Sequence, residues 1–531
     1  MVRISFPRPK SAAARASALG EYVFRHKIVL WAVVAGLITI RQLSSYSRNL
    51  TSMTRGSNRQ AMELAQQECR FFLAESAIPR SGLGIFTAVD IAKGEQTQSM
   101  PDICIYVADT PSGTDFHTHS WAGSVFMGRY EGQNSRGACE GVATLVNTMP
   151  DSVNAAELVP FQVHTNAGLK RDQNPGAGAI THYYGVTSKA RRNVAAGSEI
   201  TIDYGDWHYE SDRKYVAPVH TPEWVRKHGM CIDHIEIRQA LDPEMGRGAF
   251  ARRFLPRGTV VSPAPLQTFK NRIDFAQQEP EALFVNYCFQ PSGTNILLFP
   301  YGPGVNLINH SSEKANVRLQ WSTNAQNHRH WLDLPLQKFW EMVYPGALIL
   351  DVVALRDIQP GEELYLDYGP EWEAAWQDHV NVWEANTDPY VYPADMDLTQ
   401  PFRTLEEQKK DPYPSNLATI CFEGQWDIEE NKPVDWTEPT FWTDGMLYCH
   451  ILKREKDKKT GSYFYEVSLG YRKEPHPLDD KRYISRKVPH KAIMFVDKPY
   501  QSDMHLKNSF RHPIGISDEL IPEHWRATAV Q

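Results

Sequence analysis

The sequence predicts a mainly β protein with short helices (an α+β chain), made of two tandem domains of several small sheets and a smaller β-rich C-terminal domain. Its 531 residues exceed one ordinary hydrophobic core, so two or three domains are expected. The 33 Gly and 35 Pro residues are spread along the chain and favour short strands joined by turns. The third observation is an internal repeat.

The repeat consists of short motifs that recur in the same order at a nearly constant offset. Residues 81–86 (SGLGIF) match 245–250 (MGRGAF), and 197–205 (GSEITIDYG) match 361–369 (GEELYLDYG); 245 − 81 and 361 − 197 both give 164. Further anchors between them are glycine and asparagine pairs: Gly94 and Gly258, Asn147 and Asn309, Asn154 and Asn316. Five anchors in one order indicate a duplicated domain of ordinary size.

The two copies are expected over residues 68–220 and 230–385, and each is expected to be β-rich. In the second copy, residues 259–261 follow a Pro-Arg-Gly turn and predict a strand. The apolar run 347–355 suits a buried strand, and 363–368 alternates like a half-buried one. Helical pattern is confined to three stretches, 58–74, 280–287 and 371–385.

The rest of the chain, after the second copy, predicts a linker and a small accessory domain. Residues 386–414 are polar and rich in proline, which is typical of a linker. Residues 415–531 contain a predicted hairpin, formed by 445–453 and 461–471 around a charged turn. The aromatic residues of this region are expected to build a small β core rather than a peptide-binding cage.

Residues 1–60 form a basic N-terminus with an apolar segment at 28–40. Thirteen apolar residues are fewer than the roughly 20 needed to cross a bilayer, and no small-x-small cleavage site follows. We therefore expect a retained signal anchor and a membrane-anchored or secretory-pathway protein, with the basic flank in the cytosol. The sequon Asn49-Leu50-Thr51 agrees with lumenal exposure. A buried helix or a transit peptide is the alternative, and a nuclear location stays open.

Net charge and the cysteine spacing limit which ligands and partners the sequence predicts. The net charge of −7 gives no reason to expect direct nucleic-acid binding, because a basic surface is its usual footprint. The seven cysteines contain no pair within four residues, so no zinc or redox motif is present and no metal is predicted. Buried free thiols are expected, although one or two disulfides would be possible in an oxidising lumen.

Three motifs follow one another in the second copy: Gly246-Arg247-Gly248-Ala249-Phe250, then 304–311 (GVNLINHS), then 361–369 (GEELYLDYG). Their order and spacing resemble the SET-domain family of protein methyltransferases. The resemblance covers about 60% of the chain if both copies are counted. It implies a fold of several small sheets in which the Asn-His-Ser segment passes through a loop beside the C-terminal strand. It also implies S-adenosylmethionine as cofactor and a lysine of a protein as substrate.

The resemblance also implies roles for individual residues. The cofactor would be held by backbone groups around Gly246, Arg247 and Gly248 and by Asn309 and His310. Tyr368 matches the family's tyrosine at the methyl-transfer centre, and Tyr287 and Tyr365 are weaker candidates for lining the lysine channel.

The chemistry explains these residue types. The methyl group is already activated on a sulfonium cation, so the protein must mainly align amine, methyl and sulfur. A lysine ammonium has a pKa near 10.4, and an apolar channel lowers it. A phenol is a poor base at neutral pH. We therefore expect Tyr368 to orient the amine while the proton leaves through water.

The first copy departs from this pattern. It keeps Gly82, Gly84, Asn147 and Tyr204, but Thr148 and Met149 replace the histidine and serine of the second copy. We expect a degenerate copy that packs against the second or helps to bind substrate.

Other functions remain open at this point. A non-catalytic protein could use SET-like folds to bind a peptide without transferring a methyl group. Transfer to a non-protein amine is also compatible with the sequence. The complete set of motifs in the second copy favours catalysis.

Overall fold

The structure is a computed structural model that describes most of the chain after residue 59. The described residues are 60–79, 81–107, 121–122, 136–149, 153–159, 169–204, 218–275, 281–324, 328–341, 348–427, 432–436, 446–470, 484–498 and 500–528. The predicted signal anchor at 28–40 and the sequon at 49–51 lie outside them. None of the described helices is long and apolar enough to cross a membrane.

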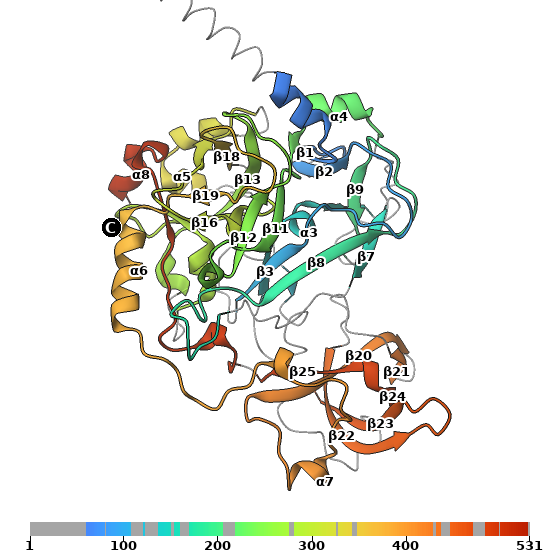
Figure 1. Ribbon diagram of the computed structural model, residues 1–531. Coiled ribbons are helices and arrows are strands. Elements are labelled where there is room, and N and C mark those ends of the chain that lie inside the picture. Colours follow the sequence, from blue (N-terminus) through green and yellow to red (C-terminus); the bar gives the residue numbers. More distant parts are fainter. Residues whose placement is uncertain are drawn as a thin grey trace, which may run out of the picture. The chain divides into compact units, whose positions relative to one another are not determined.

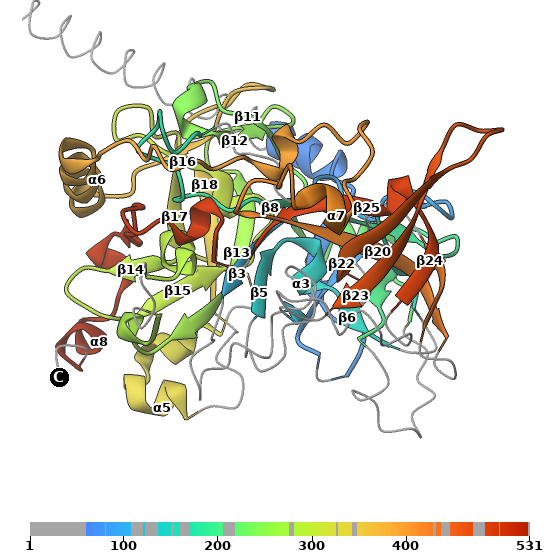
Figure 2. The same cartoon turned by 90° about the horizontal axis from the view of Figure 1, so that it is seen from below.

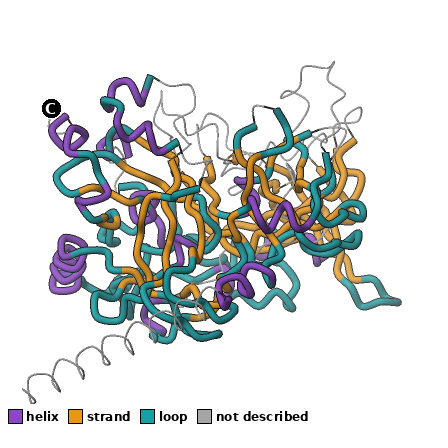
Figure 3. The backbone as a smooth tube through the Cα atoms, turned by 90° about the horizontal axis from the view of Figure 1, so that it is seen from above, coloured by secondary structure: helices purple, strands orange, loops and turns teal. Residues whose placement is uncertain are grey.

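Contacts divide the chain into one unit from Met1 to Glu63 and another from Leu64 to Gln531. The second unit consists of strands in several small sheets with few, short helices, as Figure 3 shows by colour. The prediction of a mainly β fold with short helices is therefore confirmed.

The segment predicted as the first copy forms two five-stranded sheets together with β10, which comes from the start of the segment predicted as the second; Figure 1 labels β1, β2 and β9 of one sheet and β3, β7 and β8 of the other. The first has the order β10-β1-β2-β9-β6, with β1 Phe71–Glu75, β2 Leu83–Thr87, β6 Asn147–Thr148, β9 Glu199–Ile202 and β10 Met230–Cys231. The second has the order β4-β5-β3-β8-β7, with β3 Asp102–Val107, β4 Trp121–Ala122, β5 Arg136–Glu140, β7 Ala155–Val159 and β8 Tyr183–Ala190. Helices α3 (Val142–Leu145) and α4 (Pro222–His228) complete this part.

One helix prediction is right for its first part and wrong for its end. Of the stretch 58–74, residues 60–67 are helical, whereas 71–74 belong to β1. The apolar sequence FFLA is buried there between β2 and β10. Burial on both sides in a sheet outweighs a helical pattern, because packing contributes more than local propensity.

The segment predicted as the second copy contains a larger sheet and two small ones. The six-stranded sheet has the order β17-β18-β13-β15-β14-β26, with β13 Val260–Phe269, β14 Phe289–Pro291, β15 Leu297–Pro300, β17 Val317–Trp321, β18 Leu348–Ala354 and β26 Ile514–Ile516. The two-stranded sheets are β11 (Ile235–Gln239) with β12 (Arg247–Ala251), and β16 (Asn309–His310) with β19 (Tyr365–Leu366). The helices are α5 (Leu336–Trp340), α6 (Pro370–Val382) and the 3-10 turns η6 (Leu283–Tyr287) and η7 (Val305–Leu307).

The strands predicted at 259–261 and 347–355 are confirmed as β13 and β18, whose side chains are almost all buried. The predicted helices at 280–287 and 371–385 correspond to η6 and α6. Strand 363–368 is reduced to the two residues of β19, because Tyr365 and Leu366 pair in parallel with β16 and the chain then turns away.

The C-terminal region forms a separate antiparallel sheet, seen from below in Figure 2. Its order is β21-β20-β22-β23-β24, with β25 also paired to β20; the bounds are β20 Leu417–Asp427, β21 Lys432–Trp436, β22 Met446–Lys456, β23 Tyr463–Gly470, β24 Ile484–Pro489 and β25 Ile493–Asp497. The pairing of β22 with β23 confirms the predicted hairpin. Helix α7 (Leu405–Gln408) precedes this sheet, and α8 (Glu523–Thr528) follows β26.

The stretch predicted as a linker, 386–414, is packed against both neighbours. Tyr392 and Phe402 are buried. The hydroxyl of Tyr392 donates to Asp503 Oδ2 (2.9 Å), and Arg171 Nε donates to Asp503 Oδ1 (2.7 Å). A buried ion pair therefore connects the first half of the chain to the segment after the C-terminal sheet.

Six of the seven cysteines form disulfides: Cys69–Cys231, Cys104–Cys139 and Cys421–Cys449. Cys288 is free and buried. The expectation of free thiols is therefore wrong for six cysteines. The partners are 162, 35 and 28 residues apart, and only the folded sheets bring them together.

Candidate active site

The three motifs of the second copy meet at Asn309. Strand β16 pairs in parallel with β19, which places Asn309 opposite Tyr365. The amide Nδ2 of Asn309 donates to the carbonyl oxygen of Arg247 (3.0 Å) and to Glu363 Oε1 (3.1 Å). Glu363 is 1% exposed. One asparagine therefore links the glycine motif to the C-terminal motif.

His310 extends the same junction. The backbone N–H of Tyr368 donates to His310 Nδ1 (3.0 Å), and His310 Nε2 lies 3.0 Å from Glu373 Oε1 at the start of α6. Because Nδ1 accepts, the ring proton belongs on Nε2, where it donates to the carboxylate. The imidazole thus holds Tyr368 on one side and α6 on the other.

Tyr368 is held by its hydroxyl as well as by its backbone. The phenol donates to the carbonyl oxygen of Ile308 (2.6 Å), the residue that precedes Asn309. Burial raises the pKa of Tyr368 above its ordinary value, and the nearby Tyr287 raises it further. The phenol therefore stays protonated at neutral pH. Its lone pairs can accept a hydrogen bond from an amine, but it cannot serve as a base.

The other two tyrosines occupy different surroundings. Tyr287 is buried, and its hydroxyl accepts a hydrogen bond from the backbone N–H of Thr181 (2.8 Å). Tyr365 donates to Glu363 Oε2 (2.7 Å). Tyr287 is thus close enough to affect the pKa of Tyr368, whereas the Tyr365 hydroxyl is committed to Glu363.

A cavity of about 770 Å³ lies beside the junction. Its lining includes Met245, Ser311 and Tyr365, each next to or within one of the three motifs. Both signs of charge are present in the lining: Asp242, Glu313, Lys314, Arg356, Glu362 and Glu363. Arg247, Asn309, His310 and Tyr368 do not line it. The motifs therefore converge, while the roles given to these residues in cofactor binding and transfer stay predictions.

Sequence reasoning missed the segment after the C-terminal sheet. Strand β26 adds in parallel to β14, and Gly515 N donates to the carbonyl oxygen of Tyr368 (3.0 Å). Phe510 packs edge-on against Trp372 and Trp376 of α6. No motif in the sequence marks this segment, because its partners lie far away in the sequence.

The first half repeats the junction of the second. In each half an asparagine amide joins a carbonyl oxygen to a buried glutamate, and a tyrosine hydroxyl donates to the carbonyl before that asparagine. The first-half atoms are Asn147 Nδ2 to Leu83 O (2.8 Å) and Glu199 Oε1 (2.9 Å), and Tyr204 Oη to Val146 O. Tyr204 N donates to the hydroxyl of Thr148 (3.2 Å), where the second half uses His310. Gly84 lies against Glu199, and Gly82 has φ +68°.

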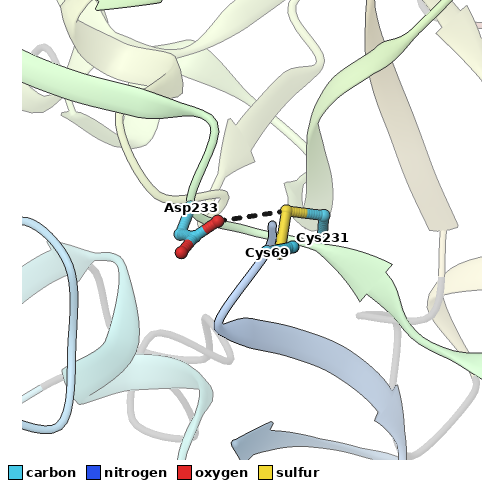
Figure 4. Close-up of side chains that lie close together, drawn as sticks. All are labelled: Cys69, Cys231 and Asp233. Carbon is cyan, nitrogen blue, oxygen red and sulfur yellow. Dashed lines mark hydrogen bonds between the residues drawn. A yellow bond between two sulfur atoms is a disulfide. The ribbon is translucent and has the colours of Figure 1, made fainter. Parts of the chain in front are cut away.

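One cluster of potential metal ligands contains a disulfide. Cys69, Cys231 and Asp233 lie together, as Figure 4 shows, but the two sulfurs are bonded to each other. A disulfide sulfur is not a thiolate ligand. Asp233 instead pairs with Arg253 at 2.8 Å.

The family profile described as SET domain matches residues 246–369, which contain the glycine motif, the Asn-His pair and Tyr368. Residues 246–369 are therefore a SET domain, and this match does not extend to the rest of the chain.

Similar solved structures include a putative histone methyltransferase of Plasmodium falciparum, with 20% identity and a TM-score of 0.18 over 27% of this chain and 99% of that one. An active polycomb repressive complex 2 in the basal state is 16% identical, with a TM-score of 0.19 over 29% of this chain and 17% of that one. No curated protein matches the chain. These likenesses are too distant to indicate a substrate.

Proposed function

We propose that this chain is an S-adenosylmethionine-dependent methyltransferase that modifies a lysine side chain of a protein. The observation that carries the proposal is the junction at Asn309, which ties the carbonyl of Arg247 to Glu363 beside His310 and Tyr368. Three motifs far apart in sequence are held in one place by specific hydrogen bonds. This is the geometry that a shared cofactor and substrate site requires.

The cofactor would be held by the backbone of 246–248 and by Asn309 and His310. S-adenosylmethionine supplies a methyl group on a sulfonium cation, together with an ammonium and a carboxylate. The cavity of about 770 Å³ is lined by Met245 and Ser311, the chain neighbours of Gly246 and His310, and not by the assigned cofactor residues themselves.

Tyr368 would orient the substrate amine. Its hydroxyl proton is used by the carbonyl of Ile308, so the phenol oxygen can accept an N–H of the amine. A lysine next to this tyrosine leaves water, and loss of water lowers the pKa of the ammonium. The substrate lysine then presents a neutral amine to the methyl group.

The two-copy organisation belongs to the same proposal. The matching junctions at Asn147 and Asn309 support a duplication, with copies at 68–220 and 230–385. The first copy has Thr148 in place of the histidine, which favours a supporting role. Residues 415–531 would be an accessory region, and its last strand, β26, pairs with β14 of the second copy.

A secretory or membrane-anchored location is also proposed. Three disulfides support it, because such bonds persist in oxidising compartments. The basic N-terminus with its apolar segment agrees with this location. The substrate would then be a protein of that compartment or of the membrane surface.

Label transfer from S-adenosylmethionine tests the proposal. The full chain is incubated with the labelled cofactor and cell extract, in parallel with Tyr368→Phe and Asn309→Ala. We expect labelled protein with the unmodified chain and about 100-fold less with either variant. Thr419→Ala, which removes a half-buried hydroxyl that donates to Cys449 O in the C-terminal sheet, is the control. Equal labelling by all four proteins would remove the site assignment, and retained peptide binding without any label would favour the non-catalytic alternative.

A further inference from the structure

Three contacts from the first copy reach the candidate active site of the second. Glu140 Oε2, at the end of β5, accepts a hydrogen bond from Asn306 N (2.9 Å). The N–H of Thr181 donates to the hydroxyl of Tyr287 (2.8 Å). The third contact is the Arg247 guanidinium, which lies 3.5 Å above the ring centroid of Tyr184. Three parts of the second copy therefore contact the first copy: the glycine motif through Arg247, the turn η7 through Asn306, and Tyr287.

Glu140 is the most unusual of these groups. It is 1% exposed, and its Oε1 has no hydrogen-bond partner among the described residues. A buried carboxyl with an unused oxygen is costly to the fold. Burial raises the pKa of Glu140 to about 8, and the negative Asp102 also raises it. Such a group changes charge near neutral pH.

The turn η7 connects Glu140 to Tyr368. Glu140 holds Asn306 N at this turn, and the carbonyl of Ile308, just after it, accepts the Tyr368 hydroxyl (2.6 Å). The carboxyl and the phenol are thus attached to one short piece of backbone. The charge of Glu140 also raises the pKa of Tyr287, and Tyr287 raises that of Tyr368, so the three groups are neighbours.

We propose that the first copy completes the methyl-transfer centre of the second, with Glu140 as the positioning residue that holds the turn to which Tyr368 is bound. The inference rests on the proposed function of that centre. In this proposal the first copy contributes to catalysis by positioning the turn that binds Tyr368, and it needs no transfer activity of its own.

Other ionisable groups face this cluster and enter the pH dependence. Asp102 on β3 faces Glu140, while Tyr368 and Arg511 face Tyr287. Burial lowers the pKa of Arg511 only to about 10, so it stays cationic at neutral pH. Burial holds the pKa of both phenols above neutral pH. Glu140 is therefore the member of this cluster expected to titrate between pH 7 and 9.

The test compares Glu140→Gln with Asp497→Asn in the full chain. Asp497 is also a buried carboxyl with a raised pKa, but it lies in the C-terminal sheet, where it accepts from Asn416 and Tyr390. The readouts are kcat and KM for methyl transfer from pH 6 to 10. We expect a transition near pH 8 in the unmodified chain, which Glu140→Gln removes because its amide does not titrate; Glu140→Ala, which leaves Asn306 N without this acceptor, should lower kcat about 10- to 100-fold. Asp497→Asn should keep the transition.

Hydrogen exchange supplies a readout that does not need activity. Glu140→Ala should speed exchange at residues 304–310, and Asp497→Asn should not. Suppose that the unmodified chain transfers methyl and that Glu140→Gln has the same kcat and the same pH profile. This result would overturn the inference and leave the proposed function standing. Unchanged exchange at 304–310 in Glu140→Ala would do the same. An inactive unmodified chain would instead remove the proposed function, and this inference with it.

Discussion

At the scale of single residues, Gly248 sets how closely two motifs approach. A Cβ at this position would lie 2.2 Å from Glu363 Oε1 and 3.2 Å from Asn309 Nδ2. The resemblance implied that backbone groups around Gly248 hold the cofactor. In the structure the space beside Gly248 is taken by the buried glutamate that holds Asn309.

Gly248→Ala should therefore destabilise the chain and weaken cofactor binding together. The added methyl must displace Glu363, at a cost of about 1–3 kcal/mol. Urea unfolding and calorimetric titration with S-adenosylmethionine measure the two effects. Gly84→Ala is the matched control: its Cβ would lie 2.1 Å from Glu199 Oε1, so it should lose similar stability and keep the affinity. An unfolding midpoint unchanged in Gly248→Ala would contradict the close approach.

Glu140 should also make stability depend on pH. Its pKa rises from 4.5 in the unfolded chain to about 8 in the folded one, so the folded state holds the proton more strongly. This contribution is complete below pH 4.5 and is lost as pH rises to 8, at no more than about 1.4 kcal/mol per pH unit. Unfolding free energies at pH 5, 6, 7 and 8 should fall less steeply in Glu140→Gln than in the unmodified chain. Parallel slopes for the two proteins would contradict the raised pKa.

At the scale of elements, strand β26 pairs with β14, which ends more than 200 residues earlier in the sequence (514 − 291 = 223). Its pairing with β14 covers an edge strand, and Gly515 lies against the carbonyl of Tyr368. An edge strand left open would attract other chains. The edge of the sheet is thus the three-residue β26, and a very short edge strand is one way in which proteins limit pairing with other chains.

Gly515→Ala should loosen this strand. A Cβ on Gly515 would lie 2.7 Å from the carbonyl oxygen of Tyr368, so the strand has to shift and its hydrogen bond weakens. Amide exchange at 514–516 should become about tenfold faster, which corresponds to about 1.4 kcal/mol of local stability. Gly461→Ala, in the hairpin turn with nothing within 4 Å of its Cβ, should leave exchange at 514–516 unchanged. Full protection in Gly515→Ala would show that β26 does not need this close contact.

At the scale of the whole molecule, disulfides connect parts that sequence alone keeps apart. Cys69–Cys231 ties residue 69, just before β1, to β10, across a sequence separation of 162 residues. Crosslinks over long loops restrict the unfolded chain most in the entropic account. The bond therefore connects two segments of the fold that lie far apart in the sequence.

Alkylation and mass spectrometry should find three disulfides and one thiol. We expect no modification of the native chain, because Cys288 is buried. One modified cysteine should appear after denaturation, and seven after denaturation with reductant. Reductant should also lower the melting temperature, since removing such a bond typically costs about 2–5 kcal/mol. More than one reactive cysteine in the denatured, unreduced chain would contradict the pairing.

The sequence by itself determined the features that depend on local pattern. Glycine and proline spacing with alternating apolar residues gave the mainly β class, and apolar runs gave β13 and β18. The three motifs around Gly246, Asn309 and Tyr368 identified the SET domain and the residues that meet at its centre. These signals are local because turns, strand periodicity and short motifs are written within a few residues.

Only the tertiary structure decided the features that depend on distant partners. The disulfides pair cysteines that share no local spacing, and Phe71–Ala74 is a strand because two other strands flank it. Glu140 reaches Asn306 across 166 residues, and β26 adds to β14 through backbone pairing and the burial of Ile514 and Ile516. The energy of such contacts comes from burial and alignment in the folded chain, and no pattern of neighbouring residues records them.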